Sequence, residues 1–141
     1  MPQPTPASPK NSMLMRLYLL FVAALILPIA LSYGIDPVAM LPKILDMTVT
    51  GTDQIHIFRA MMFLYLGACT FWLIAAFNPA WQRIAVIWAV IFALSLAVGR
   101  AFSFAIDGRA SLLLDIYFVL EVLGGLLGLA VLRYEDRKAK Q

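Results

Sequence analysis

The sequence predicts an all-α integral membrane protein, a bundle of four transmembrane helices with a short interfacial helix between the first two. Of its 141 residues, 62% are hydrophobic and only 13% are charged, and the mean hydropathy is +0.86. A soluble domain is about half apolar and about a quarter charged. The apolar residues here are gathered into long runs, each able to cross a hydrocarbon core of about 30 Å at about 1.5 Å per helical residue.

The chain before the first apolar run is rich in proline, so we expect a disordered N-terminal tail over residues 1–12. The four-helix domain is then expected over residues 13–133. Its first span covers about residues 14–33, and Pro28 should kink the far end of this helix.

A cleaved signal peptide is the alternative for this first run. Lys10 and Arg16 would form its positive segment, and Ala30-Leu31-Ser32 would pass as its cleavage site. We favour an uncleaved helix, because the apolar run is long for a signal peptide.

The connection after the first span has apolar residues at helical spacing, at Val38, Leu41, Ile44 and Leu45. This pattern predicts a short amphipathic helix that lies in the interface or caps the bundle. The segment from Thr50 to Asp53 then supplies the turn before the next helix.

The remaining spans are expected over residues 53–77, 81–106 and 110–132. Asn78-Pro79 ends the first of these, and Asp107-Gly108-Arg109 forms the last turn. A basic tail follows over residues 134–141.

The distribution of basic residues predicts the orientation. Lys10, Arg16, Arg83 and the basic tail would all lie on one side, which the positive-inside rule assigns to the cytoplasm. We therefore expect a multi-pass membrane protein with both termini in the cytoplasm. Its net charge of +3 is a topology signal and does not indicate a nucleic-acid partner.

Polar residues gather at the helix ends that this topology places on the outer side. The candidate cluster, structural or ligand-binding, consists of Asp53, His56, Arg59, Arg100, Ser103, Asp107, Ser111, Asp115 and Glu121. An unpaired charge at bilayer depth costs at least about 2.5 kcal/mol. We therefore expect Arg59 and Arg100 to face inward and to meet Asp107, Asp115 or Glu121.

No catalytic residue, cofactor or metal can be assigned from these residues. The chain has one histidine and one cysteine, Cys69, so a metal centre built on either residue type is not expected. Gly124 and Gly128 have the G-x-x-x-G spacing that lets helices approach closely, within the bundle or in a dimer.

Two stretches carry a family resemblance. The first is Leu41-Pro42-Lys43 followed by Thr52 to Ala60 and Leu64-Tyr65-Leu66-Gly67, and the second is Gly99-Arg100 with Ser103, Asp107-Gly108 and Ser111. Together they resemble the family named domain of unknown function 4345, which comprises small bacterial membrane proteins. The resemblance implies four spans over nearly the whole chain and a place in the cell membrane of a bacterium, the inner membrane. It supplies no substrate, cofactor or catalytic residue.

The leading hypothesis is a non-enzymatic membrane protein whose polar cluster fixes the bundle and binds a small or lipidic ligand. The lipid bilayer is its expected surrounding, and a homo-oligomer or a larger membrane complex is a further expectation. One alternative is an isomerase-like intramembrane enzyme that acts on a lipid, with Glu121, Asp115 and His56 in acid–base roles. A second alternative is a small proton-coupled carrier with Glu121 as its titrating group.

Overall fold

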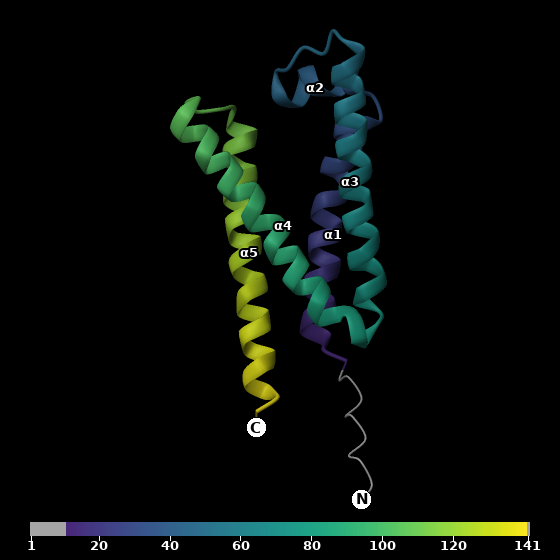
Figure 1. Cartoon of the computed structure of the whole chain (residues 1–141), viewed down its shortest axis with the longest axis vertical. Coiled ribbons are helices and arrows are strands. Elements are labelled where there is room, and N and C mark those ends of the chain that lie inside the picture. The colour runs from purple at the N-terminus through teal and green to yellow at the C-terminus, as the bar shows by residue number, and fades with distance from the viewer. Residues whose placement is uncertain (1–10, 141) are drawn as a thin grey trace, which may run out of the picture.

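The computed structural model describes residues 11–140, and in this range the chain folds into five α-helices without any strand (Figure 1). Four of the helices are long and apolar enough to cross a membrane. The short one lies between the first two of these, so the predicted all-α class and helix order are confirmed. The helices are α1 Met13–Gly34, α2 Pro37–Leu45, α3 Thr52–Ala76, α4 Pro79–Ile106 and α5 Leu112–Lys138.

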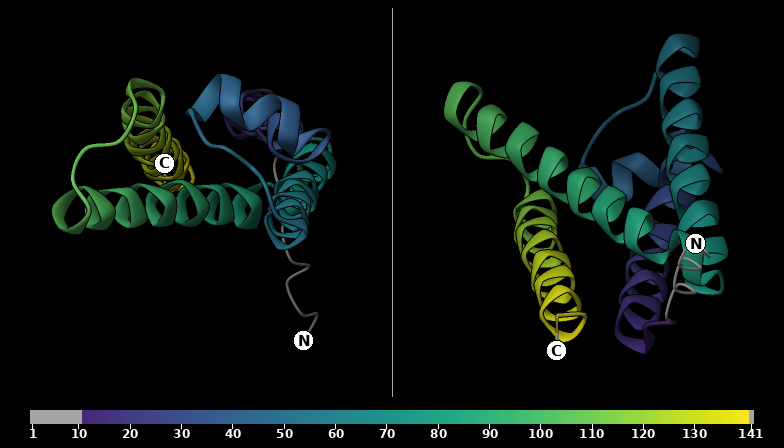
Figure 2. Two further views of the ribbon diagram at one scale, coloured as in Figure 1. Left: turned by 90° about the horizontal axis from the view of Figure 1, so that it is seen from above. Right: turned by 60° about the horizontal axis from the view of Figure 1, so that its bottom comes forward.

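The long helices alternate in direction, and α2 lies across the end of the bundle where α1 finishes and α3 begins (Figure 1). The described chain starts and finishes at the opposite end. Seen from above, α1 and α5 lie on the same side of α4 (Figure 2). In Figure 1, α4 is inclined, so its far half leads away from α3 and stays beside α5.

Short polar residues begin several of the helices by accepting backbone N–H groups that have no partner within the helix. The Asp36 side chain accepts the N–H of Ala39 at 3.1 Å, and the Asn78 side chain accepts that of Ala80 at 3.1 Å. Before α3, the Gln54 side chain accepts the N–H groups of Thr50 and Gly51.

The N-terminal tail was expected to be disordered over residues 1–12, and the first ten of these lie outside the described residues. Asn11 and Ser12 differ from the expectation. The buried Gln82 amide accepts the Ser12 N–H at 3.0 Å and donates to Asn11 Oδ1 at 2.9 Å and to the carbonyl of Ala76 at 3.1 Å. A buried amide needs such partners, and here the start of the chain supplies two of them.

The main core lies between α1, α3 and the first half of α4, where small side chains let the helices approach closely. Ala75, Ala76, Ala85 and Ala89 are fully buried, and they surround the large ring of Trp72, which is also fully buried. A second cluster, around Tyr33, Leu41 and Tyr65, joins α1, α2 and α3 at the other end.

Glycines bring α5 against α4. A Cβ atom added at Gly125 would overlap Leu94, and one added at Gly128 would overlap Val90 and the Tyr18 hydroxyl. Gly124 was expected to pack in the same way, but a Cβ atom there would meet nothing within 4 Å. Gly124 instead lines a cavity that is described below.

The last helix continues beyond the expected end of the fourth span, to Lys138. No proline or glycine interrupts it after Gly128. Asp136 in this extension forms an exposed ion pair with Arg83 at the start of α4, with an N–O distance of 2.8 Å. The segment expected as a basic tail is therefore largely helical.

We expect Gly128→Ala to destabilise the protein by about 1–3 kcal/mol, because the added methyl group overpacks the contact between α5 and α4. Gly124→Ala is the matched control, since its methyl group enters open space. The lone cysteine, Cys69, is buried, so a thiol-reactive fluorogenic dye can report thermal unfolding in detergent. Equal unfolding midpoints for the two variants would contradict the assigned helix contact.

Candidate functional site

The nine polar residues singled out in the sequence do not form one cluster. Asp53, His56 and Arg59 lie on the first turns of α3 and are exposed. Within residues 11–140, none of these three side chains takes part in an ion pair or a side-chain hydrogen bond. The structure of these residues therefore does not contain the expected pair between Arg59 and a carboxylate.

The separation follows from the inclination of α4. The expectation assumed that the start of α3 would face the end of α4 and the start of α5. In the described chain α3 and α5 make no contact, and α4 touches α3 mainly through the main core (Figure 1). Asp53, His56 and Arg59 are thus at the same end of the bundle as the polar residues of α4 and α5, but α3 is not in contact with α5.

Four of the remaining residues, Ser103, Asp107, Ser111 and Asp115, lie at or near the exposed turn between α4 and α5. Ser103 Oγ donates to Asp107 at 2.8 Å, and Arg109 pairs with Asp115 at 3.0 Å. Ser111 is the N-cap residue of α5, although its hydroxyl has no hydrogen-bond partner within the described residues. Because Arg109 is 84% exposed, water screens its pair with Asp115.

Arg100 and Glu121 form the one ion pair of the described chain that is largely buried. The Arg100 Nε–H lies between the two carboxylate oxygens of Glu121, at 3.0 Å and 2.9 Å. The two side chains are 19% and 10% exposed. By the helix rise, Arg100 is about 9 Å from the end of α4 and Glu121 about 14 Å from the start of α5. The pair therefore lies well inside the span of these helices.

Tyrosines surround this pair. The Arg100 guanidinium carbon is 5.5 Å from the centre of the Tyr117 ring, a cation–π distance. The Tyr33 hydroxyl, from the end of α1, lies near Arg100, Tyr117 and Glu121. The pair thus has aromatic and hydroxyl neighbours from two of the helices around it.

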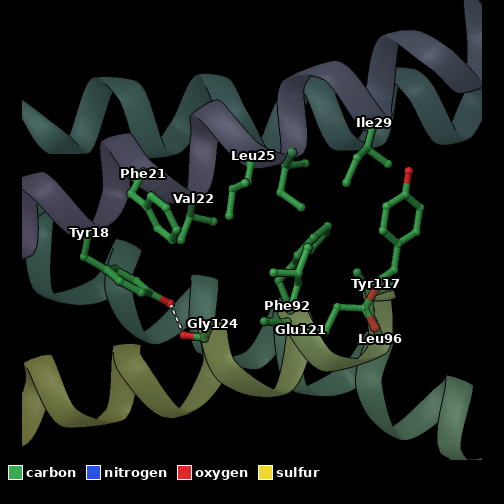
Figure 3. A pocket seen from close by; sticks show the side chains of 13 residues that line it. Tyr18, Phe21, Val22, Leu25, Ile29, Phe92, Leu96, Tyr117, Glu121 and Gly124 are labelled. Carbon is green, nitrogen blue, oxygen red and sulfur yellow. Dashed lines mark hydrogen bonds between the residues drawn. The ribbon is translucent and has the colours of Figure 1, made fainter. Parts of the chain in front are cut away.

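Next to the ion pair is an apolar cavity of about 70 Å³ between α1, α4 and α5 (Figure 3). Glu121 and Tyr117 line one end of it, and the hydrogen bond from the Tyr18 hydroxyl to the Gly124 carbonyl, 3.0 Å long, lies at the other. Apolar side chains of α1 and α4 form most of the remaining wall. They include Val22, Leu25, Ile29, Phe92 and Leu96.

The cavity is partly open to the outside of the bundle between α1 and α5. Phe21 and Leu120 line it and are also 51% and 42% exposed, so they border this opening. In a membrane the opening would face lipid chains, which could enter sideways.

Sequence reasoning missed Tyr18, Tyr33 and the cavity, whereas it places Tyr117 on the same helix face as Glu121. Tyr117 precedes Glu121 by one helical turn, and this spacing was a usable signal for a neighbour of the carboxylate. Tyr18 and Tyr33 come from a helix far away in the chain, and no local pattern connects them to α5. Gly124 resembled a packing residue, whereas it borders the cavity.

The arrangement can hold an amphipathic molecule, with a polar group at the ion pair and an apolar part in the cavity. Among the described residues, no three metal-ligating side chains of His, Cys, Asp or Glu come together. His56 is exposed on α3 and does not reach Glu121, so these residues do not assemble the acid–base set weighed for an isomerase.

We expect Arg100→Met to reduce stability by up to about 3–5 kcal/mol, because the Glu121 carboxylate loses its partner inside the bundle. The double variant Arg100→Met/Glu121→Leu should recover most of this loss. The Cys69 dye assay measures both.

Arg83→Met is the control, because it breaks an ion pair in which both side chains are about half exposed. Its effect should stay within about 1 kcal/mol. If Arg100→Met and Arg83→Met shift the unfolding midpoint equally, the buried pair does not stabilise the bundle.

Comparison with known proteins adds a family and no activity. Neither the curated proteins nor the solved structures contain a match to this chain. The sequence model of one family, described as Domain of unknown function (DUF4345), matches residues 14–132. This range covers α1 from its second residue, all of α3 and α4, and α5 as far as Leu132. It includes Arg100, Glu121 and every residue that lines the cavity. The chain belongs to the DUF4345 family, as the resemblance in its sequence indicated.

Proposed function

We propose that the protein binds a small amphipathic, lipid-like molecule in the cavity between α1, α4 and α5. The observation that carries this proposal is the Glu121 carboxylate, which pairs with Arg100 and lines an otherwise apolar cavity that is partly open to the side. Apolar cavities of this kind stay free of water and accept apolar ligands, and a few polar groups fix the orientation of the ligand.

The size of the cavity limits what can enter it. Its volume of about 70 Å³ is roughly half that of a cavity of about 150 Å³ that accepts benzene. A segment of a single acyl or alkyl chain fits this space better than a fused-ring molecule. The rest of the chain would extend through the opening beside Phe21 and Leu120 into the surrounding lipid.

The ion pair has a second role in this proposal, because it ties α4 to α5 and thereby maintains one wall of the cavity. We place the protein in a bacterial inner membrane, with both termini in the cytoplasm. The described residues begin and end at the same end of the bundle, which supports placing both termini on one side of the membrane (Figure 1). Labelling of Lys140→Cys in a Cys69→Ser background, in intact and in opened cells, checks it.

We expect Gly124→Leu to abolish ligand binding, because Gly124 lines the cavity and no neighbouring atom lies within 4 Å of its Cβ position, so a leucine side chain there can occupy the cavity. Native mass spectrometry of protein purified in mild detergent should show a bound lipid-like mass in the wild type and lose it in this variant. The same spectra report whether the protein is a monomer, a homo-oligomer or part of a larger complex.

Gly67→Leu is the matched control. Gly67 also has nothing within 4 Å of a Cβ position, but it lines an open groove between α3 and α4. Binding should persist in this variant. A wild-type protein without bound ligand, or equal loss in both variants, would rule out the cavity as the binding site.

A further inference from the structure

The last helix ends in basic side chains that the rest of the bundle leaves exposed. Arg133 and Arg137 are four residues apart on α5, so they lie on one face of the helix, about 6 Å apart along its axis. Both are exposed, and neither belongs to the ion pairs formed among the described residues. Lys138 and Lys140 follow them and are exposed as well.

The acidic residues of the same segment are turned away from the two arginines. Asp136 pairs with Arg83 of α4 at 2.8 Å, so its charge is balanced within the protein. Glu135 is two residues from both Arg133 and Arg137, and because two residues turn a helix by about 200°, it lies on the opposite side. The carbonyl end of the helix adds about half a negative charge. The basic side chains outweigh it, and this face carries a net positive charge.

The same face of α5 is apolar farther into the span. Leu126 precedes Arg133 by seven residues, which is two helical turns or about 10 Å, and Val119 precedes Leu126 by two more turns. Both apolar side chains are more than half exposed. In a membrane this stripe would contact acyl chains over most of its length and would end at the two arginines.

Exposed aromatic side chains indicate where the membrane surface lies. Tyr134 of α5 and Trp81, near the start of α4, are both exposed at this end of the bundle. Amphipathic rings of this kind are enriched at the level of the lipid head groups. The pair of Arg83 and Asp136 joins the same two helices at this end. The two arginines of α5 therefore come close to the head groups.

From these observations we infer that this face of α5 binds an anionic phospholipid. Its phosphate group accepts hydrogen bonds from Arg133 and Arg137, and one of its acyl chains lies along Leu126 and Val119. A guanidinium group suits this role, because its planar set of donors matches two oxygens of a phosphate. The inference is independent of the cavity ligand, since none of these four residues lines the cavity.

The experiment compares phosphatidylglycerol with phosphatidylcholine that has the same acyl chains. The full chain is purified in mild detergent, an equimolar mixture of the two lipids is added, and native mass spectrometry measures the bound fraction of each. We expect the wild type to favour phosphatidylglycerol by at least about tenfold. This ratio corresponds to about 1.4 kcal/mol, within what two basic side chains contribute near an anionic lipid surface.

In Arg133→Gln/Arg137→Gln we expect the preference to fall by at least about fivefold, because both charges at the phosphate are lost. Lys43→Gln/Arg59→Gln is the matched control. It removes two exposed positive charges at the opposite end of the bundle and so gives the same net charge. Its preference should equal that of the wild type. The Cys69 dye assay without added lipid verifies that both variants are folded.

Equal binding of the two lipids by the wild type, or the same loss in both double variants, would overturn the inference. Gly124→Leu then locates the anionic lipid, because it fills the cavity and leaves the basic face unchanged. The preference should persist in this variant, and its disappearance would place the anionic lipid in the cavity instead.

Glycerol phosphate, added at the same concentration as the lipids, distinguishes a lipid from a free phosphate. It has no acyl chain to lie along Leu126, so it should not displace phosphatidylglycerol. Displacement by this soluble compound would show that the arginines bind a free phosphate group and that the lipid is not the preferred partner.

Discussion

The structure depends on one interaction, the ion pair of Arg100 and Glu121 within the span of two apolar helices. A charge at this depth is costly unless another group balances it, and each of these side chains balances the other at 2.9 Å. The pair sets α4 and α5 in one register, with Gly125 and Gly128 close against α4. The α4–α5 hairpin is therefore held by the ion pair at Glu121 and, one to two turns further along α5, by close packing at Gly125 and Gly128.

The position of α1 turns this hairpin into a candidate binding site. Tyr18 holds α1 to α5 through the Gly124 carbonyl, and Tyr33 brings the end of α1 beside the ion pair. Between these two points the helices do not close, and the cavity remains (Figure 3). Glu121 and Tyr18 thus hold helices together and also line the cavity, so a structural role and a binding role do not exclude each other.

The sequence was sufficient to predict the helices, because four long apolar runs and strong helix-ending residues are local signals. It also predicted that Arg100 meets a carboxylate, since the cost of an isolated charge requires it. The choice among Asp107, Asp115 and Glu121 depended on the register of α4 and α5, which steric contacts set at Gly125 and Gly128. The inclination of α4, which separates Arg59 from this site, comes from packing between distant segments and had no local signal.

The central claim is that Arg100 and Glu121 form a direct pair inside the bundle when the protein is in a lipid bilayer. Solid-state nuclear magnetic resonance of the protein in bilayers can test it through the dipolar coupling between Arg100 Nε and the Glu121 carboxyl carbon. Strong dephasing, as required by an N–O distance of 2.9 Å, is the predicted result. Absence of dephasing in a well-folded sample would show that the two groups are apart, and it would contradict both the helix register and the site built on it.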